Sequence, residues 1–137
     1  MPADYMPWRE EYSVEVISID AQHKHLVSLI NGMTLVLQRG SQSHEVVALL
    51  EDLLEYTRSH FAFEERMMAQ AGYLGLAAHR KKHAAMQSEV GRMLAEAKAG
   101  NVMVPLKLMP FLRGWLAKHI MGTDKSYVPA LKKAGIA

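Results

Sequence analysis

Hydrophobic side chains recur at helical spacing in four segments of the chain, and short polar or glycine-containing stretches separate these segments. The first segment covers about residues 20–39, and its apolar positions three and four residues apart predict an amphipathic helix. The stretch 40–43 ends it and precedes a second helix with an apolar stripe that extends to Met68. After a tight turn at 72–75, a third helix is predicted up to about Lys98.

The fourth segment, from Leu108 to Ile120, contains a conflicting signal. Pro105 is suited to the first turn of a helix, whereas Pro110 lacks the N–H group that a helix interior uses. The fourth helix is therefore predicted either to begin after Pro105 or to kink near its start. Residues 127–133 are compatible with a short terminal helix.

Four helices of roughly 20 residues joined by short loops predict an all-α protein, folded as an up-down-up-down four-helix bundle. The expected organisation is one domain over residues 1–137, with an extended N-terminal arm over 1–19 and the helical bundle over 20–133. The arm carries Trp8, Val14 and other apolar side chains. We expect it to pack across the bundle, because so apolar a segment is unfavourable in solvent.

Composition narrows the class of protein. The 137 residues are 50% hydrophobic and 22% charged, the balance of a soluble globular domain, and no apolar run reaches the ~20 residues of a membrane span. The absence of cysteine excludes disulfides, thiolate metal sites, iron–sulfur clusters and cysteine nucleophiles. A net charge of +2 without a long basic stripe argues against a nucleic-acid partner. We therefore expect a monomeric, cytoplasmic protein.

Five of the seven histidines fall on the inward faces of the predicted helices. Two pairs of potential ligands lie four residues apart, which places the members of each pair on one helix face. Since successive helices of the bundle are antiparallel, the starts of the first and third helices meet the ends of the second and fourth. The potential metal ligands expected at this end are His23, His60, Glu64, His79, His83, His119 and Asp124.

Burial of these groups without a metal ion would cost several kcal/mol each, so the sequence predicts a metal centre. Imidazole and carboxylate ligands suit iron, zinc, copper or nickel, and this set exceeds the four ligands of a tetrahedral zinc site. Two roughly octahedral ions offer about twelve positions. The imidazoles, two bridging carboxylates and one bridging oxide or hydroxide fill about eleven of them, which leaves one position for a small ligand.

Asp124 is the exception to the helical pattern of this set. It follows His119 by five residues, which is about 140° around an ideal helix. A local distortion at Gly122, such as a π-helical turn, is required to bring its carboxylate inward.

The motifs that carry these ligands resemble those of the bacteriohemerythrins, single-domain bacterial relatives of the oxygen-carrying hemerythrins. The matching stretches are residues 12–14, 19–24, 60–65, 79–83 and 115–125, in the order of that family and over almost the whole chain. The departures are Glu15 where glycine is common, Leu74 where proline is common, and the unexpected Pro110. None of them is at a ligand position.

The resemblance implies two non-haem iron ions joined by an oxide or hydroxide bridge. One iron would be held by His79, His83 and His119, and the other by His23 and His60. Glu64 and Asp124 would bridge the two ions. Dioxygen would bind at the iron that has two histidines, and the protein would serve oxygen storage, delivery or sensing rather than act as an enzyme.

The side chains close to the predicted ligands are mostly apolar, which favours simple dioxygen binding because apolar walls exclude water. The expected walls of the dioxygen pocket are Leu26, Phe61, Trp115, Leu116 and Ile120. Two alternatives stay open: a diiron redox enzyme, such as a peroxidase or a nitric-oxide-consuming catalyst, and an oxygen- or redox-sensing domain of a signalling system. His25, His44 and Glu65 are expected to lie outside the ligand set. His25 is expected to face solvent, and Glu65 is expected either to be solvated or to contact a ligand from outside the metal centre.

Overall fold

The protein is an all-helical bundle in a computed structural model that describes residues 8–38, 43–101 and 103–137. No strand occurs in these residues, so the predicted fold class is confirmed. The predicted turn at 40–43 lies almost wholly outside the described part of the chain. The five α-helices of the described residues are α1 Ile17–Gln38, α2 Ser43–Gln70, α3 Leu76–Lys98, α4 Val104–Lys118 and α5 Val128–Lys133.

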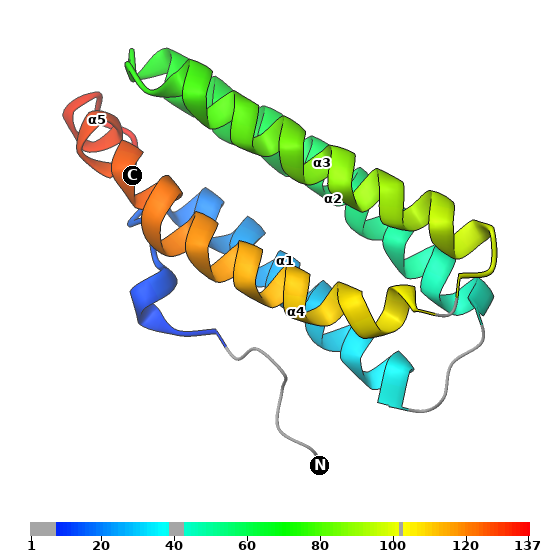
Figure 1. Ribbon diagram of the computed structural model, residues 1–137. Helices are drawn as coiled ribbons and strands as arrows, with labels where there is room; N and C mark the ends of the chain where they lie inside the picture. The colour runs from blue at the N-terminus through cyan, green and yellow to red at the C-terminus, as the bar shows by residue number, and fades with distance from the viewer. Residues whose placement is uncertain (1–7, 39–42, 102) are drawn as a thin grey trace.

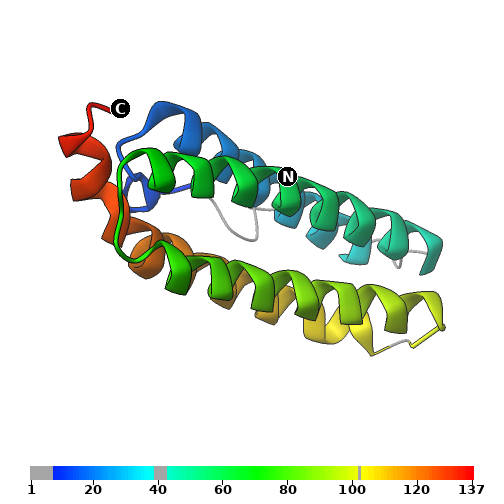
Figure 2. The same cartoon turned by 90° about the horizontal axis from the view of Figure 1, so that it is seen from above.

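The four long helices run up, down, up and down, as Figure 1 shows. Each packs against two neighbours: α1 against α2 and α4, and α3 against α2 and α4. Figure 2 shows that the start of α1, the end of α2, the start of α3 and the end of α4 share one end of the bundle. We call this the site end; α5 also lies there (Figure 1).

Glycine residues end α2 and α3 at the positions where the sequence predicts turns. Gly72 and Gly100 have φ angles of 65° and 88°, a left-handed conformation that costs glycine little. The next residues close the helix ends, because the N–H of Tyr73 donates to the carbonyl oxygen of Met68 at 3.0 Å. The tight turn between α2 and α3 places the end of one beside the start of the other.

The N-terminal arm is shorter than the sequence predicts. Helix α1 begins at Ile17 rather than Asp20, and a 3-10 turn occupies Glu10–Tyr12. The carboxylate of Asp20 accepts hydrogen bonds from the Ser13 hydroxyl at 2.6 Å and from the Val14 N–H at 2.8 Å. These bonds hold the arm on the first turn of α1, and Val14 and the neighbouring Val16 are fully buried, as expected of an arm that packs across the bundle.

Helix α4 includes both prolines of its segment. It begins at Val104 and continues to Lys118 with Pro110 inside it. Of the two predicted alternatives, a start after Pro105 is therefore wrong, and a kink near the start stays a prediction. The ring of Pro110 is exposed. The hydrogen bond that proline omits is therefore lost on the solvent side of the helix, where water can satisfy the free carbonyl group.

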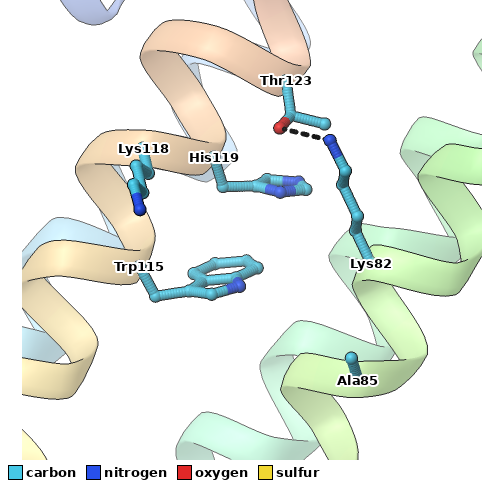
Figure 3. A pocket seen from close by; sticks show the side chains of 6 residues that line it. All are labelled: Lys82, Ala85, Trp115, Lys118, His119 and Thr123. Carbon is cyan, nitrogen blue, oxygen red and sulfur yellow. Dashed lines mark hydrogen bonds between the residues drawn. The ribbon is translucent and has the colours of Figure 1, made fainter.

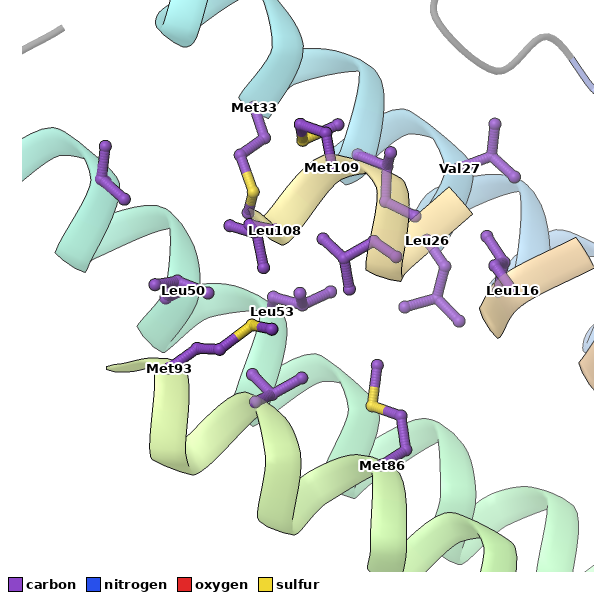
Figure 4. Packing of buried hydrophobic residues seen from close by; sticks show 14 of the residues in the cluster. Leu26, Val27, Met33, Leu50, Leu53, Met86, Met93, Leu108, Met109 and Leu116 are labelled. Carbon is purple, nitrogen blue, oxygen red and sulfur yellow. The ribbon is translucent and has the colours of Figure 1, made fainter. Parts of the chain in front are cut away.

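The core outside the site end is apolar and rich in methionine (Figure 4). Leu50, Leu53, Leu108 and Leu112 are at most 1% exposed. Methionine side chains adapt to irregular gaps between leucines. This packing fixes the four helices and thereby positions the polar side chains at the site end, and the buried methionines of this core are Met33, Met86, Met93 and Met109.

Candidate metal centre

The seven potential ligands predicted from the sequence come together at the site end. Every one of their side chains is 4% exposed or less. They form two groups of ligand atoms, each with all atoms within 4.8 Å of one another. One group contains His79, His83, His119, Glu64 and Asp124; the other contains His23, His60 and Glu64.

Glu64, near the end of α2, presents a different carboxylate oxygen to each group of imidazoles. Its Oε1 lies 3.1 Å from Nε2 of both His79 and His83. Its Oε2 lies 3.2 Å from Nε2 of His23 and 3.3 Å from Nε2 of His60. The carboxylate therefore has the orientation of a bridge between two positions.

Asp124 divides its oxygens between the same two groups. Oδ1 lies 2.9 Å from Nε2 of His119 and 3.0 Å from Nε2 of His79, and Oδ2 lies 3.2 Å from Nε2 of His23. A π-helical turn at His119–Thr123 makes this possible, since the N–H of Asp124 donates to the carbonyl oxygen of His119. The distortion that the sequence requires near Gly122 is present.

The donor atoms are arranged for metal ions rather than for hydrogen bonds alone. Both carboxylate oxygens of Asp124 are buried and have no hydrogen-bond partner in the described part of the chain. Nε2 of His83 and Nε2 of His119 face each other at 3.1 Å. An ion with bonds of about 2.1 Å at right angles holds neighbouring ligand atoms about 3 Å apart. The observed separations match that spacing, so the residues fit two metal positions.

Two hydrogen bonds on the outer side of the cluster orient the imidazoles. Nδ1 of His60 donates to Oε1 of Gln22 at 2.6 Å, and Nδ1 of His83 donates to Oε2 of Glu65 at 2.8 Å. Because an amide or carboxylate oxygen can only accept, each Nδ1 carries the proton. The Nε2 lone pair then points into the cluster, which is the form of histidine that binds a metal.

Tyr127 is a member of the site that the sequence analysis missed. It is fully buried, and its hydroxyl donates to Oε2 of Glu64 at 3.2 Å. Burial raises the pKa of the phenol well above its usual value, so the hydroxyl stays protonated and remains a donor. The only signal in the sequence is its position three residues after Asp124, in the segment predicted as a terminal helix.

In the metal-free cluster the carboxylates hold protons on two imidazoles. Burial lowers the pKa of His23 and His79, but the short contacts of each imidazole with the two buried carboxylates and their negative charge outweigh burial and raise each pKa to about 9. Burial raises the pKa of Glu64 and Asp124, but the facing imidazoles hold both well below the usual range. Burial lowers the pKa of His60. Metal binding must therefore displace protons.

Of the residues expected to line the pocket, two have ring contacts with cluster imidazoles. Leu26, Leu116 and Ile120 are buried. Phe61 stacks on the imidazole of His83 with ring centroids 3.8 Å apart, and Trp115 stacks on His119 at 4.4 Å. Both rings therefore contact the group with three histidines.

Trp115 also lines a cleft of about 300 Å³ that is open to the surface. Lys82, Lys118 and Thr123 line the same cleft, and Figure 3 shows the Lys82 ammonium group directed toward Thr123. His119 also lines this cleft. The cleft therefore brings solvent close to the group of three histidines.

The other two histidines lie outside the cluster. His25 is exposed and its ring rests on that of Tyr56, with centroids 4.3 Å apart. His44 is exposed at the start of α2. Neither contributes to the two groups of ligand atoms.

The fold and the cluster define a class of protein: a four-helix bundle with a candidate two-position metal centre at one end. Residues 16–131 match the family model described as the hemerythrin HHE cation binding domain. The chain therefore belongs to the hemerythrin family. No helix of the described residues has the length and apolar character that a membrane crossing requires.

Named relatives agree with this assignment. The chain is 34% identical over 128 residues to the bacteriohemerythrin of Pseudomonas paraeruginosa, across 93% of this chain and 82% of that protein. It is 32% identical over 127 residues to the bacteriohemerythrin of Methylococcus capsulatus, across 92% and 96%. A crystal structure of wild-type hemerythrin superposes with a TM-score of 0.86 at 30% identity, across 93% of this chain and 98% of that one.

Proposed function

We propose that this protein binds dioxygen reversibly at a diiron centre and serves oxygen storage, delivery or sensing in the cytoplasm. The observation that carries the proposal is the division of the carboxylate oxygens. Glu64 and Asp124 each direct one oxygen to the group of three histidines and one to the group of two. That division supports two bridged metal positions with unequal numbers of imidazoles.

The unequal ligand count supports a single vacancy. His79, His83 and His119 would hold one iron, and His23 and His60 the other. The second iron would then keep a coordination position for a small molecule. When bound, the iron pair supplies the two electrons and the open position that reversible dioxygen binding needs. The oxygen-binding function comes from the resemblance to hemerythrins and from their names, and the ligand geometry supports it.

The apolar side chains around the centre would keep water from the bound ligand. We propose Leu26, Phe61, Trp115, Leu116 and Ile120 for this role. Because Phe61 and Trp115 stack on His83 and His119, they would also orient these imidazoles. The buried aliphatic residues are then the proposed walls of the vacancy.

A diiron redox enzyme is the second candidate, and the buried phenol of Tyr127 is the observation that favours it. Its hydroxyl lies 3.2 Å from Oε2 of Glu64, the oxygen directed to the group of two histidines, and a proton donor there could assist chemistry at the vacancy. However, burial raises the pKa of Tyr127, which makes it a poor donor of protons. Dioxygen binding is therefore the better supported function.

The test is the visible spectrum of protein reduced and loaded with iron under anaerobic conditions. We expect an absorption band that appears when dioxygen is admitted and disappears when it is removed, over repeated cycles. Irreversible oxidation on first exposure, or rapid consumption of hydrogen peroxide or nitric oxide, would contradict the proposal. His60→Gln should abolish the reversible band, whereas the exposed and matched His25→Gln should retain it.

A further inference from the structure

The outer nitrogens of three of the five cluster imidazoles, those of His83, His60 and His23, have three different environments. Nδ1 of His83 donates to a carboxylate, that of Glu65, at 2.8 Å. Nδ1 of His60 donates to the neutral amide oxygen of Gln22 at 2.6 Å. Nδ1 of His23 is buried without a hydrogen-bond partner in the described part of the chain. The charged acceptor thus contacts a member of the group of three histidines, and the neutral acceptor contacts a member of the group of two.

The Glu65 carboxylate is held in place from the opposite side. Its Oε1 accepts a hydrogen bond from Nε of Arg80 at 3.2 Å, while its Oε2 faces His83. Arg80 and His83 lie three residues apart on α3 and so share a face; Glu65 reaches them from α2. The Glu65 side chain is 22% exposed and the His83 side chain 2%, so the carboxylate acts on a buried imidazole from the edge of the protein.

Gln22 is anchored by a different contact. Its backbone carbonyl accepts a hydrogen bond from the Tyr56 hydroxyl at 3.3 Å, which links α1 to α2 beside the His60 imidazole. Its side chain supplies no net charge. Both histidines are therefore oriented by a side-chain oxygen on the neighbouring helix, and the two oxygens differ in charge.

A negative acceptor at Nδ1 draws the N–H proton away from the ring and makes the opposite nitrogen a stronger electron donor. A neutral amide has a smaller effect. Arg80 moderates the charge of Glu65 without removing the hydrogen bond, and its own side chain is 57% exposed, so water screens it. Nε2 of His83 is consequently a stronger electron donor to a metal ion than Nε2 of His60.

We infer that Glu65 is a positioning residue that makes the group containing His83 the tighter of the two metal positions, with Gln22 as its neutral counterpart at the other position. The inference rests on the proposed two-metal centre but not on its reaction with dioxygen. The pair of acceptors would set the order in which the two positions fill and empty.

Titration with Co²⁺ in competition with a chelator tests the inference, because Co²⁺ reports affinity without dioxygen chemistry. Glu65→Gln retains an oxygen acceptor and removes the charge. We expect it to weaken the tighter position by about 10–100-fold and to leave the weaker one within about threefold. His60→Gln, which removes a ligand only from the two-histidine group, identifies which of the two measured affinities belongs to which group.

The reciprocal variant and a control complete the experiment. Gln22→Glu should strengthen the weaker position, and the double variant Gln22→Glu/Glu65→Gln should narrow or invert the difference between the two. Glu55→Gln removes a charge from the same helix at an exposed side chain paired with Arg58, and it should leave both affinities unchanged. The hyperfine-shifted Nδ1 proton of His83 in the Co²⁺ form should move in Glu65→Gln but not in the control.

Three results would overturn the inference: unchanged affinity in Glu65→Gln, equal weakening of both positions, or the same effect in Glu55→Gln. Binding of fewer than two Co²⁺ per chain by the unaltered protein would instead contradict the proposed diiron centre. In that case the effect of Glu65→Gln on the single bound ion still decides the role of Glu65. Circular dichroism of each variant separates loss of the fold from loss of affinity.

Discussion

At the site end of the bundle, seven side chains with nitrogen or oxygen ligand atoms are buried to 4% exposure or less. At the opposite end, the same four helices pack through Leu50, Met93 and Leu108, which contain no charged atom (Figure 4). The apolar end gains stability directly from burial. The site end buries groups whose desolvation is unfavourable unless a counter-charge compensates it.

This difference predicts which conditions affect each end. Contacts between apolar side chains do not depend on protons or metal ions, so the packing around Leu50 should be the same in metal-free and metal-loaded protein. The imidazoles and carboxylates of the site end exchange protons for metal ions. Their contribution to the free energy of unfolding should therefore change with pH and with metal concentration.

The largest effect is expected for Glu64→Ala, which removes the carboxylate that faces both groups of imidazoles. The change leaves buried imidazoles without their acceptor, at a cost of about 3–5 kcal/mol, and it should lower bound iron and thermal stability together. Iron per chain and the melting temperature measure the two effects. Glu55→Ala, on the exposed face of the same helix, is the control; iron content equal to that of the control would refute the bridging role.

Leu116→Ala and Leu50→Ala are a matched pair for the two ends. Both leucines are buried, so each truncation should cost about 2–5 kcal/mol as a core cavity. Iron content should stay nearly intact in both. Only Leu116→Ala, one helical turn before His119, should accelerate oxidation of the oxygenated protein by admitting water. Equal lifetimes in the two variants would show that the pocket wall is elsewhere.

As the pH rises, the stability of the metal-free protein should fall, whereas the affinity for metal should rise. His23 and His79 have pKa values raised to about 9 in the metal-free cluster. Their protons stabilise the metal-free fold below pH ~6.5, and this stability is lost as the pH rises through about 9. Metal must displace these protons, so metal affinity should rise over the same range by up to about 2.7 kcal/mol per pH unit.

Denaturation of the metal-free and metal-loaded proteins at several pH values, together with metal titrations at the same pH values, measures these two opposite trends. A metal-free protein that gains stability from pH 7 to pH 9.5 would contradict the assignment of the raised pKa values. The double variant His23→Gln/His79→Gln should remove most of the pH dependence over this range.

The smallest effect concerns Glu15, which lies two residues before the start of α1. Glu15 has a φ angle of 60°, and its carboxylate pairs with Lys132 of α5 at 2.8 Å. Glycine would relieve the left-handed strain but lose a surface ion pair worth about 0–1 kcal/mol. Glu15→Gly should therefore change stability by less than about 1 kcal/mol, whereas Glu15→Val should cost about 1–3 kcal/mol; chemical denaturation distinguishes the two.

Much of the fold and of the candidate ligand set is predictable from the sequence, because both depend on helical spacing. The inward stripes predict the helices, and antiparallel packing then brings His23, His60, His79 and His119 to one end. The bounds of α3 agree with the predicted segment up to Lys98. Asp124 shows where spacing alone is insufficient: the sequence demands a distortion, and only the structure supplies its form, a π-helical turn.

Other features depend on contacts that a linear sequence does not encode. The early start of α1 follows from hydrogen bonds that Asp20 accepts from the arm. Glu65 follows the predicted ligand Glu64 but lies off the helix face that carries His60 and Glu64. Helical spacing therefore predicts that Glu65 lies at the edge of the site. Its contact with His83 arises because α3 passes close enough for a long side chain to reach. Tyr127 is likewise placed by the turn that follows α4.

Anomalous diffraction at the iron absorption edge, from crystals of iron-loaded protein, tests the proposed centre most directly. We expect two peaks about 3.5–4 Å apart, one within reach of His79, His83 and His119 and the other within reach of His23 and His60, with Glu64 and Asp124 between them. A single peak, or iron bound away from these seven side chains, would contradict the two-metal centre.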